Sequence, residues 1–174
     1  MASDVLKSRT DAKLRYAALH VEELRQQPAG RGHDFERAHQ EACLAQLFGA
    51  YAALLQELNV DLRCGLATKG LTPGKMRKAL EAEGRSSSTL RDLYLLEQDR
   101  TSWFRQAKDA RDYTSHISGI PLTHNIGGRD DGVTSLRNPE TNAELPGDAT
   151  DTLAAWVSEM EKLVETIRHA AAQP

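Results

Sequence analysis

The segment from Arg111 to His116 places an arginine and a histidine in R-x4-H spacing near the end of a predicted helix. A guanidinium carries a permanent positive charge, whereas an imidazole titrates close to neutral pH and can accept or donate a proton. Cleavage of a phosphodiester without a metal requires such a pair, one group to offset negative charge and one to move a proton. Arg111 and His116 are therefore the residues whose types and spacing point most directly to chemistry.

Ideal helix geometry does not by itself bring these two side chains together. Residues five positions apart on one helix differ by about 140° in direction and ~7.5 Å in rise. Either the helix is distorted before His116, or a two-fold dimer brings two copies of the pair into one cleft. An arginine at the edge of an apolar face, as here, is expected to bind a carboxylate or a phosphate. The alternative is a structural ion pair at Arg111 and a histidine that suits the negative end of the helix dipole.

The composition favours a helical protein with no overall attraction for nucleic acid. The chain has 174 residues, of which 40% are hydrophobic and only 5% aromatic, and it is rich in Ala, Leu, Glu and Arg. These values favour a single all-helical domain over residues 1–174, long enough to bury a core. The formal net charge is −3, so any RNA must bind to a local positive patch, which two subunits could build together.

Membrane, disulfide and metal sites are not indicated by the sequence. The first residues lack the apolar stretch of a signal peptide, and no later run approaches a membrane span, so we expect a soluble, cytoplasmic protein. Cys43 and Cys64 are the only cysteines, and Cys43 falls in an apolar stretch, which favours a reduced thiol in the core. His39 lies four residues before Cys43, but no further ligand has suitable spacing, so neither a metal nor another cofactor is expected.

Periodic apolar residues and helix-start signals divide the chain into helical segments. The predicted starts, each marked by residue types that can cap a helix, are residues 8–11 with Ser8 and Thr10, Asp34, Thr72, residues 86–89 and Asp148. Residues 42–55 of the second helix are apolar nearly all round, which predicts a central helix surrounded by others. A kink is expected near Thr101 in the helix that reaches His116. The final helix has an unbroken apolar stripe over residues 153–167, which fits either core packing or an interface with another chain.

Residues 119–147 differ from the rest of the chain, because they are rich in Gly, Asn, Asp, Thr and Pro. Residues 122–126 and 133–136 within them have β-forming composition, so a small hairpin is expected, with turns at residues 127–128 and 131–132. A connection of this length in a helical domain is commonly functional or mobile, and it begins three residues after His116. The sequence predicts an all-α bundle of five or six helices, up-and-down in outline, with a long loop or small hairpin before the last helix.

A run of cations before Arg111 could follow the phosphate backbone of a nucleic acid. Its members are Arg91, Arg100, Arg105 and Lys108. Three aspartates alternate with them, namely Asp92, Asp99 and Asp109. This alternation favours a solvated face of mixed charge over a binding track.

The region around Arg111 also resembles the R-x4-6-H motif of the HEPN superfamily of helical-bundle proteins. The residues that carry the resemblance are Trp103-Phe104, the segment from Arg111 to His116 with the polar Asp112 after its arginine, and Gly119. The Gly-rich loop that follows, the segment 136–139 and the final amphipathic helix also look like those of HEPN-type bacterial proteins.

The resemblance implies a metal-independent endoribonuclease, of the kind found in toxin–antitoxin, antiphage and RNA-processing systems. Arg111 would hold the scissile phosphate, His116 would act as general acid or base, and Asp112 would orient one of them. RNA would be the substrate, a cyclic phosphate would remain on the product, and the protein would be a homodimer.

Two alternatives to the nuclease remain at this point. Some members of the superfamily keep the fold without catalysis, so a scaffold or regulatory protein-binding module of the same fold is the first. The second is an antitoxin-like or structural partner that binds another protein through residues 156–167. Loss of RNA cleavage on substitution of Arg111 or His116 separates the nuclease from both.

Overall fold

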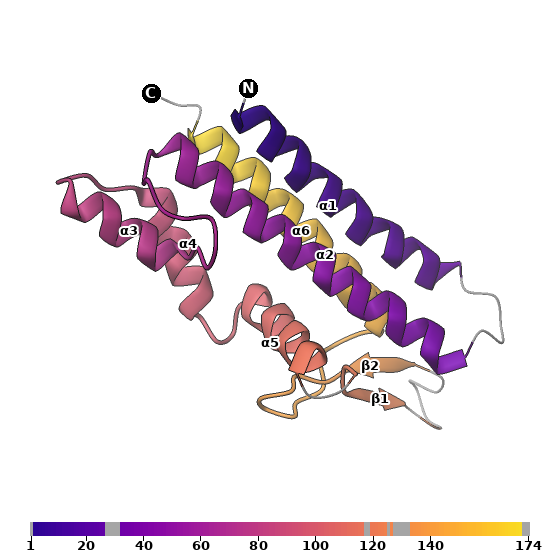
Figure 1. Cartoon of the computed structure of the whole chain (residues 1–174). Helices are drawn as coiled ribbons and strands as arrows, with labels where there is room; N and C mark the ends of the chain where they lie inside the picture. Colours follow the sequence, from indigo (N-terminus) through magenta and orange to yellow (C-terminus); the bar gives the residue numbers. More distant parts are fainter. Residues whose placement is uncertain (1, 27–31, 117–118, 125, 127–132, 172–174) are drawn as a thin grey trace.

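The computed structural model describes residues 2–26, 32–116, 119–124, 126 and 133–171, which form six α-helices and one two-stranded sheet (Figure 1). The helices are α1 (Ala2–Arg25), α2 (Gly32–Asp61), α3 (Pro73–Ala82), α4 (Ser88–Gln98), α5 (Trp103–His116) and α6 (Ala149–Ala171). The strands β1 (Leu122–His124) and β2 (Thr134–Leu136) are antiparallel, with Leu122 opposite Leu136. The all-α bundle with a small hairpin before the last helix, predicted from the sequence, is confirmed.

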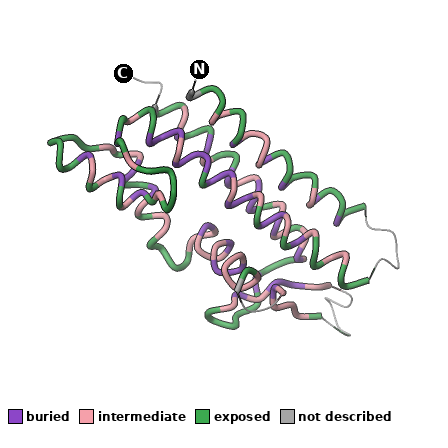
Figure 2. The backbone as a smooth tube through the Cα atoms, in the orientation of Figure 1, coloured by how far each residue is buried: buried purple, intermediate pink, exposed green. Residues whose placement is uncertain are grey.

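Helix α2 is the centre of the fold. The helices α1 and α6 lie along it, α5 contacts it near its middle, and α3 packs on α4 (Figure 1). In Figure 2 the buried positions follow α2 and the facing sides of α1 and α6. The apolar middle of α2 is therefore covered by other helices, as predicted, apart from Ala45 and Ala52, which stay exposed.

Side-chain caps fix where the later helices begin. Thr72, Ser87 and Asp148 each accept a hydrogen bond from a backbone N–H in the first turn of α3, α4 and α6, respectively. A cap of this kind satisfies one of the N–H groups that the helix itself leaves unpaired. The expected kink near Thr101 is a full break, because α4 ends at Gln98 and α5 begins at Trp103.

The first helix begins earlier than the sequence predicted. It starts at Ala2 instead of near Ser8, so the residues expected to cap it lie inside it. Thr10, one of those residues, is fully buried and donates a hydrogen bond to Glu57 of α2. Its hydroxyl therefore serves a contact between helices, which local sequence signals do not show.

A buried ion pair joins the three long helices at one end. Arg168 of α6 contacts the Glu57 carboxylate through Nε at 3.1 Å and through a terminal nitrogen at 3.0 Å. The same guanidinium contacts Asp11 of α1 at 2.7 Å and the backbone carbonyl of Lys7 at 3.1 Å. Only 2% of the Glu57 side chain is exposed, against 26% for Arg168. A carboxylate so deeply buried depends on its partners, so Arg168 fixes how α6 lies against α1 and α2.

The hairpin and the residues after it connect α5 to α6. Leu136 and Leu145 are buried in the core, and the Asn138 side chain accepts two backbone hydrogen bonds in the loop between them. Glu140 in that loop contacts Arg105 of α5 at 2.7 Å. The turns expected at residues 127–128 and 131–132 lie outside the described residues.

Two further expectations concern the cysteines and the membrane. Cys43 and Cys64 are both buried and free, and burial raises the pKa of the Cys43 thiol to about 12. Cys43 is therefore an unreactive core thiol, as predicted. Among the described helices, none combines the length and the apolar character needed to cross a membrane.

Replacing Arg168 with alanine is expected to destabilise the protein by about 3–5 kcal/mol, because Glu57 is left as an uncompensated buried charge. The measurement is the free energy of unfolding in urea at neutral pH. Lys162→Ala is the matched control on the same helix, since its contact with Glu159 is exposed and contributes less than about 1 kcal/mol. Equal losses in the two variants would show that Arg168 does not hold the helices together.

Candidate functional site

Helix α5 brings the predicted site residues against α2. Ser102 caps the start of α5 by accepting a hydrogen bond from the backbone N–H three residues later, at 3.1 Å. Phe104 is then buried, with its ring 4.7 Å from that of Tyr51 and 5.4 Å from that of Phe48 on α2. This packing presses the apolar face of α5 onto α2. It leaves Arg111, about two turns further on, at the edge of the contact.

Arg111 is oriented by two neighbours. Its guanidinium carbon lies 5.0 Å from the centre of the Phe48 ring, a cation–π contact. One terminal nitrogen lies 3.0 Å from the Asp112 carboxylate, and 34% of the side chain is exposed. The Nε atom is buried and has no hydrogen-bond partner in the described part of the chain. The guanidinium is therefore positioned by the protein but only partly satisfied by it.

Arg111 lines an open groove of about 480 Å³ beside α2, α4 and α5. Three small residues at helical spacing contribute one face of α2: Ala45, Gly49 and Ala52. Larger apolar side chains also line the groove: Phe48, Tyr51, Leu55, Leu71 and Phe104. Its charged residues are Glu97, Lys108 and Arg111. The volume falls in the range of small-molecule pockets, about 300–1,000 Å³.

Asp112 links the two cations of the groove. One of its carboxylate oxygens lies 2.7 Å from Nζ of Lys108, and the other lies 3.0 Å from Arg111. Lys108 and Asp112 are four residues apart on α5, the spacing that places side chains next to each other on a helix. Two cations and one carboxylate leave one net positive charge. All three side chains are partly exposed, so an anion from solvent can compete with Asp112 for both cations.

An acidic side chain enters the same groove from α4. The Tyr51 hydroxyl donates a hydrogen bond to the Glu97 carboxylate at 2.8 Å. Burial raises the pKa of the Glu97 carboxyl, while the hydrogen bond from Tyr51 and the positive charge of Lys108 oppose that rise. Burial and the neighbouring carboxylate both raise the pKa of Tyr51, so its hydroxyl stays protonated and remains a donor. The groove therefore holds a partly buried acceptor near its two cations.

Two of the three predicted catalytic residues, Arg111 and Asp112, are in direct contact. His116 is the last residue of α5, but its side chain lies outside the described residues, so its approach to Arg111 stays a prediction. The sequence interpretation missed Glu97. It placed Tyr51 within the apolar residues 42–55, and Tyr51 is buried, but its contact with Glu97 was not predicted. These two residues are 46 positions apart, so no local spacing could have paired them. The sequence interpretation placed Lys108 on a solvated face of mixed charge. Its spacing of four residues from Asp112 could have predicted the contact between these two side chains.

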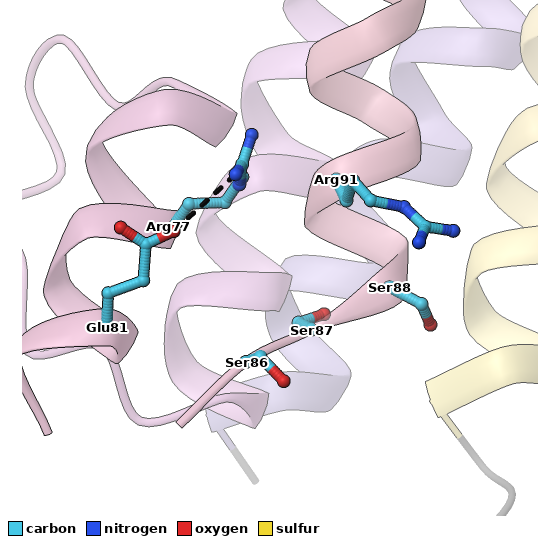
Figure 3. A pocket seen from close by; sticks show the side chains of 6 residues that line it. All are labelled: Arg77, Glu81, Ser86, Ser87, Ser88 and Arg91. Atoms are coloured by element: carbon cyan, nitrogen blue, oxygen red, sulfur yellow. Dashed lines mark hydrogen bonds and ion pairs between the residues drawn. The ribbon is translucent and has the colours of Figure 1, made fainter. Parts of the chain in front are cut away.

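A second pocket, of about 230 Å³, lies between α3 and the start of α4 (Figure 3). It is lined by Arg77, Arg91 and residues 86–88. Arg77 lies 3.5 Å from Glu81, and Arg91 pairs with its neighbour Asp92 at 3.1 Å. In Figure 3 the Arg91 guanidinium points away from that of Arg77. Because the two cations do not converge, this pocket is a weaker candidate than the groove at Arg111.

Four of the histidines form two pairs. The Nδ1 atoms of His20 on α1 and His39 on α2 lie 3.2 Å apart, and the ring centres of His33 on α2 and His124 on β1 lie 5.5 Å apart. Burial lowers the pKa of His20, and the proximity of His39 lowers it further. Within the described ranges, no group of three or more His, Cys, Asp or Glu side chains is arranged to hold a metal ion.

No protein-family model, curated protein or solved structure matches the chain. Membership of the HEPN superfamily, expected from residues 103–119, therefore stays a prediction. Any function assigned to the groove rests on its own side chains, chiefly Lys108, Arg111 and Asp112 of α5 with Glu97 of α4.

Glu97→Gln is expected to stabilise the fold slightly at neutral pH, because glutamine removes a partly buried charge and its carbonyl still accepts the hydrogen bond from Tyr51. Since the folded-state pKa of Glu97 is raised, the wild type loses stability as the pH rises from the ordinary glutamate range through that pKa. The gain in Tm, on the order of 1–2 °C, should be complete above the raised pKa and fade below it.

Differential scanning calorimetry from acidic to neutral pH measures this difference in Tm. Glu159→Gln, which alters a carboxylate on the exposed face of α6, is the matched control and should show no such gain. A lower Tm for Glu97→Gln at neutral pH would mean that the carboxylate stabilises the fold and has a structural role.

Proposed function

We propose that the protein is a metal-independent endoribonuclease of the HEPN type, with the groove at Arg111 as its active site. The observation that carries the proposal is the position of Arg111, partly exposed in a groove of about 480 Å³ beside a second cation, Lys108, and over the ring of Phe48. Paired cations suit the phosphates of a nucleic acid, and a carboxylate such as that of Glu97 suits the N–H donors of an unpaired base. Single-stranded RNA offers both kinds of group.

The proposed reaction is an internal transesterification of RNA. A base removes the proton of a ribose 2′-OH, the 2′ oxygen attacks the adjacent phosphorus, and the bond from phosphorus to the 5′ oxygen breaks. The 5′ oxygen takes up a proton, which leaves a 2′,3′-cyclic phosphate on one product and a 5′-OH on the other. His116 would transfer the proton, and Arg111 would offset the charge that builds up on the phosphate oxygens.

Asp112 would position the cations that bind the phosphate. Its contacts with Lys108 and Arg111 hold both side chains at the groove before RNA arrives. A phosphate that approaches from the solvent side can then accept charge-assisted hydrogen bonds without a large rearrangement. The same carboxylate weakens the positive field of each cation, so the site binds phosphate less tightly than two free cations would.

A homodimer is part of the proposal because of the charge of the chain. The formal net charge is −3, and the two cations of one groove, Lys108 and Arg111, are matched in number by the carboxylates of Asp112 and Glu97. Two grooves related by a two-fold axis would present two copies of Arg111 and Lys108 to one RNA strand. Such a pair would also allow His116 of one copy to act beside Arg111 of the other. A role in a toxin–antitoxin or antiphage system, with a partner that restrains the enzyme, fits this chemistry.

The second candidate is a non-catalytic scaffold or regulatory protein-binding module of the same fold. The pairing of Asp112 with both cations favours it, because a partly neutralised cluster attracts RNA less strongly. In this case the contacts of Arg111 would be structural, and the groove would bind a partner chain. RNA would then remain intact under all conditions.

Purified protein is expected to cleave single-stranded RNA in the presence of EDTA and to leave 2′,3′-cyclic phosphate ends. Arg111→Ala should lower the rate about 10²–10³-fold and His116→Ala about 10²–10⁴-fold, since each removes one catalytic group. Electrophoresis of a labelled RNA measures the rate, and circular dichroism with thermal unfolding shows that each variant is folded.

Arg91→Ala is the matched control for this experiment, because it removes an exposed arginine that lies outside the groove. Its rate should equal that of the wild type. An equal loss in Arg91→Ala would show that activity follows total charge and not the groove. RNA left intact by the wild type at every substrate and pH would overturn the nuclease proposal and favour the binding module.

A further inference from the structure

The Glu97 carboxylate lies in the groove with few hydrogen-bond donors around it among the described residues. Tyr51 donates one hydrogen bond to its Oε1 atom at 2.8 Å, and no other hydrogen bond or ion pair to this carboxylate is found among the described residues. Lys108 acts on it through its charge without direct contact. Carboxylate oxygens have about four acceptor positions in total. Most of the acceptor capacity of Glu97 is therefore not used by the described residues and remains available to a ligand.

The partial burial of the Glu97 carboxylate disfavours its charged form and raises its pKa, and the hydrogen bond from Tyr51 and the charge of Lys108 offset this only in part. The charged form is therefore held at some cost. A glutamine at the same place would keep the hydrogen bond from Tyr51 and remove the charge. Ionisable groups held against such a cost, in a pocket, are commonly there for a ligand. The ligand that a carboxylate suits is one with N–H donors.

The surroundings of Glu97 indicate a ligand that carries a phosphate. The rings of Phe48, Tyr51 and Phe104 line the groove but are almost wholly buried, and the guanidinium of Arg111 lies over the ring of Phe48. Phe48 and Tyr51 are three residues apart on α2, about 4.5 Å of helical rise. The cation beside Phe48 and the carboxylate beside Tyr51 can thus contact different parts of one nucleotide.

We propose that Glu97 selects a guanine base in the RNA that the groove binds. Guanine is the base with two adjacent N–H donors on its Watson–Crick edge, at N1 and at the exocyclic amino group, which match the two oxygens of a carboxylate. The other bases place an acceptor beside each donor, so they leave one carboxylate oxygen facing an acceptor. Tyr51 is a positioning residue, because its hydroxyl fixes the orientation of the carboxylate. That the ligand is RNA rests on the proposed function.

Titration of the purified full chain with 5′-GMP, 5′-AMP, 5′-CMP and 5′-UMP tests the selection without requiring cleavage. Saturation-transfer NMR at millimolar nucleotide detects weak binding. The wild type is expected to bind 5′-GMP about tenfold more tightly than the other three, the ratio that one bidentate pair supplies. Glu97→Gln should remove this preference, because an amide has one acceptor and one donor, and Glu159→Gln should keep it.

Tyr51→Phe separates positioning from simple packing. It should reduce the preference for 5′-GMP several-fold while the weaker affinity for 5′-AMP stays unchanged, which a general loss of packing would not produce. Equal losses for the two nucleotides would overturn the positioning role. A folded Glu97→Gln variant that still prefers 5′-GMP would overturn the role of Glu97.

The outcomes distinguish this inference from the nuclease proposal. Equal binding of all four nucleotides, or no binding, would overturn the guanine selection, whereas the cleavage experiment decides the nuclease independently. A guanine preference without RNA cleavage would support the role of Glu97 and overturn the nuclease proposal.

The dinucleotides GpU and UpG, with methylated 2′ oxygens, show whether the bound guanine belongs to RNA or to a free nucleotide. Binding of either at least as tightly as 5′-GMP supports RNA, and failure of both would assign the groove to a free guanine nucleotide.

Discussion

The need to cover α2 on all sides shapes this molecule. The helix is 30 residues long and apolar nearly all round through its middle, so burial of its surface is the main source of stability for the bundle. The helices α1 and α6 cover two of its sides, and α5 covers part of a third through Phe104. The cover is incomplete beside Ala45, Gly49 and Ala52, where the groove lies. The groove is therefore built from core helices, which hold its side chains more firmly than a loop would.

The carboxylates of Glu57 on α2 and Glu97 on α4 differ in how many hydrogen-bond and ion-pair partners they have, and this difference separates a structural role from a binding role. Glu57 is almost wholly buried, and Arg168 and Thr10 satisfy it, so it holds helices together. Glu97 is less buried and has only the Tyr51 hydroxyl as a hydrogen-bond donor among the described residues. It contributes little to the fold and remains open to a ligand. The proposed chemistry of the groove follows from this difference together with the paired cations on α5.

The sequence predicted what local patterns encode and missed what depends on distant contacts. The caps at Thr72, Ser87 and Asp148 and the central position of α2 follow from spacing and periodicity, and the structure has them. The start of α1 was placed too late, because Thr10 has the type of a capping residue but serves a contact with Glu57 on another helix. Arg111 was found through its spacing to His116, and Asp112 through the resemblance, in which a polar residue follows the arginine. Glu97 was not found, because its proposed role depends on partial burial beside Tyr51, which its neighbours in the chain do not encode.

The proposed function depends on contact between Arg111 and an RNA phosphate. The NMR signal of its Nε–H group, identified by its absence in Arg111→Lys, reports on that contact directly. The wild type is titrated with a short single-stranded RNA whose 2′ oxygens are methylated, so that it binds without being cleaved. The Arg111 signal is expected to shift and saturate while that of Arg168, which is held by Glu57 and Asp11, stays in place. An Arg111 signal that does not move at saturating RNA would contradict the proposed function.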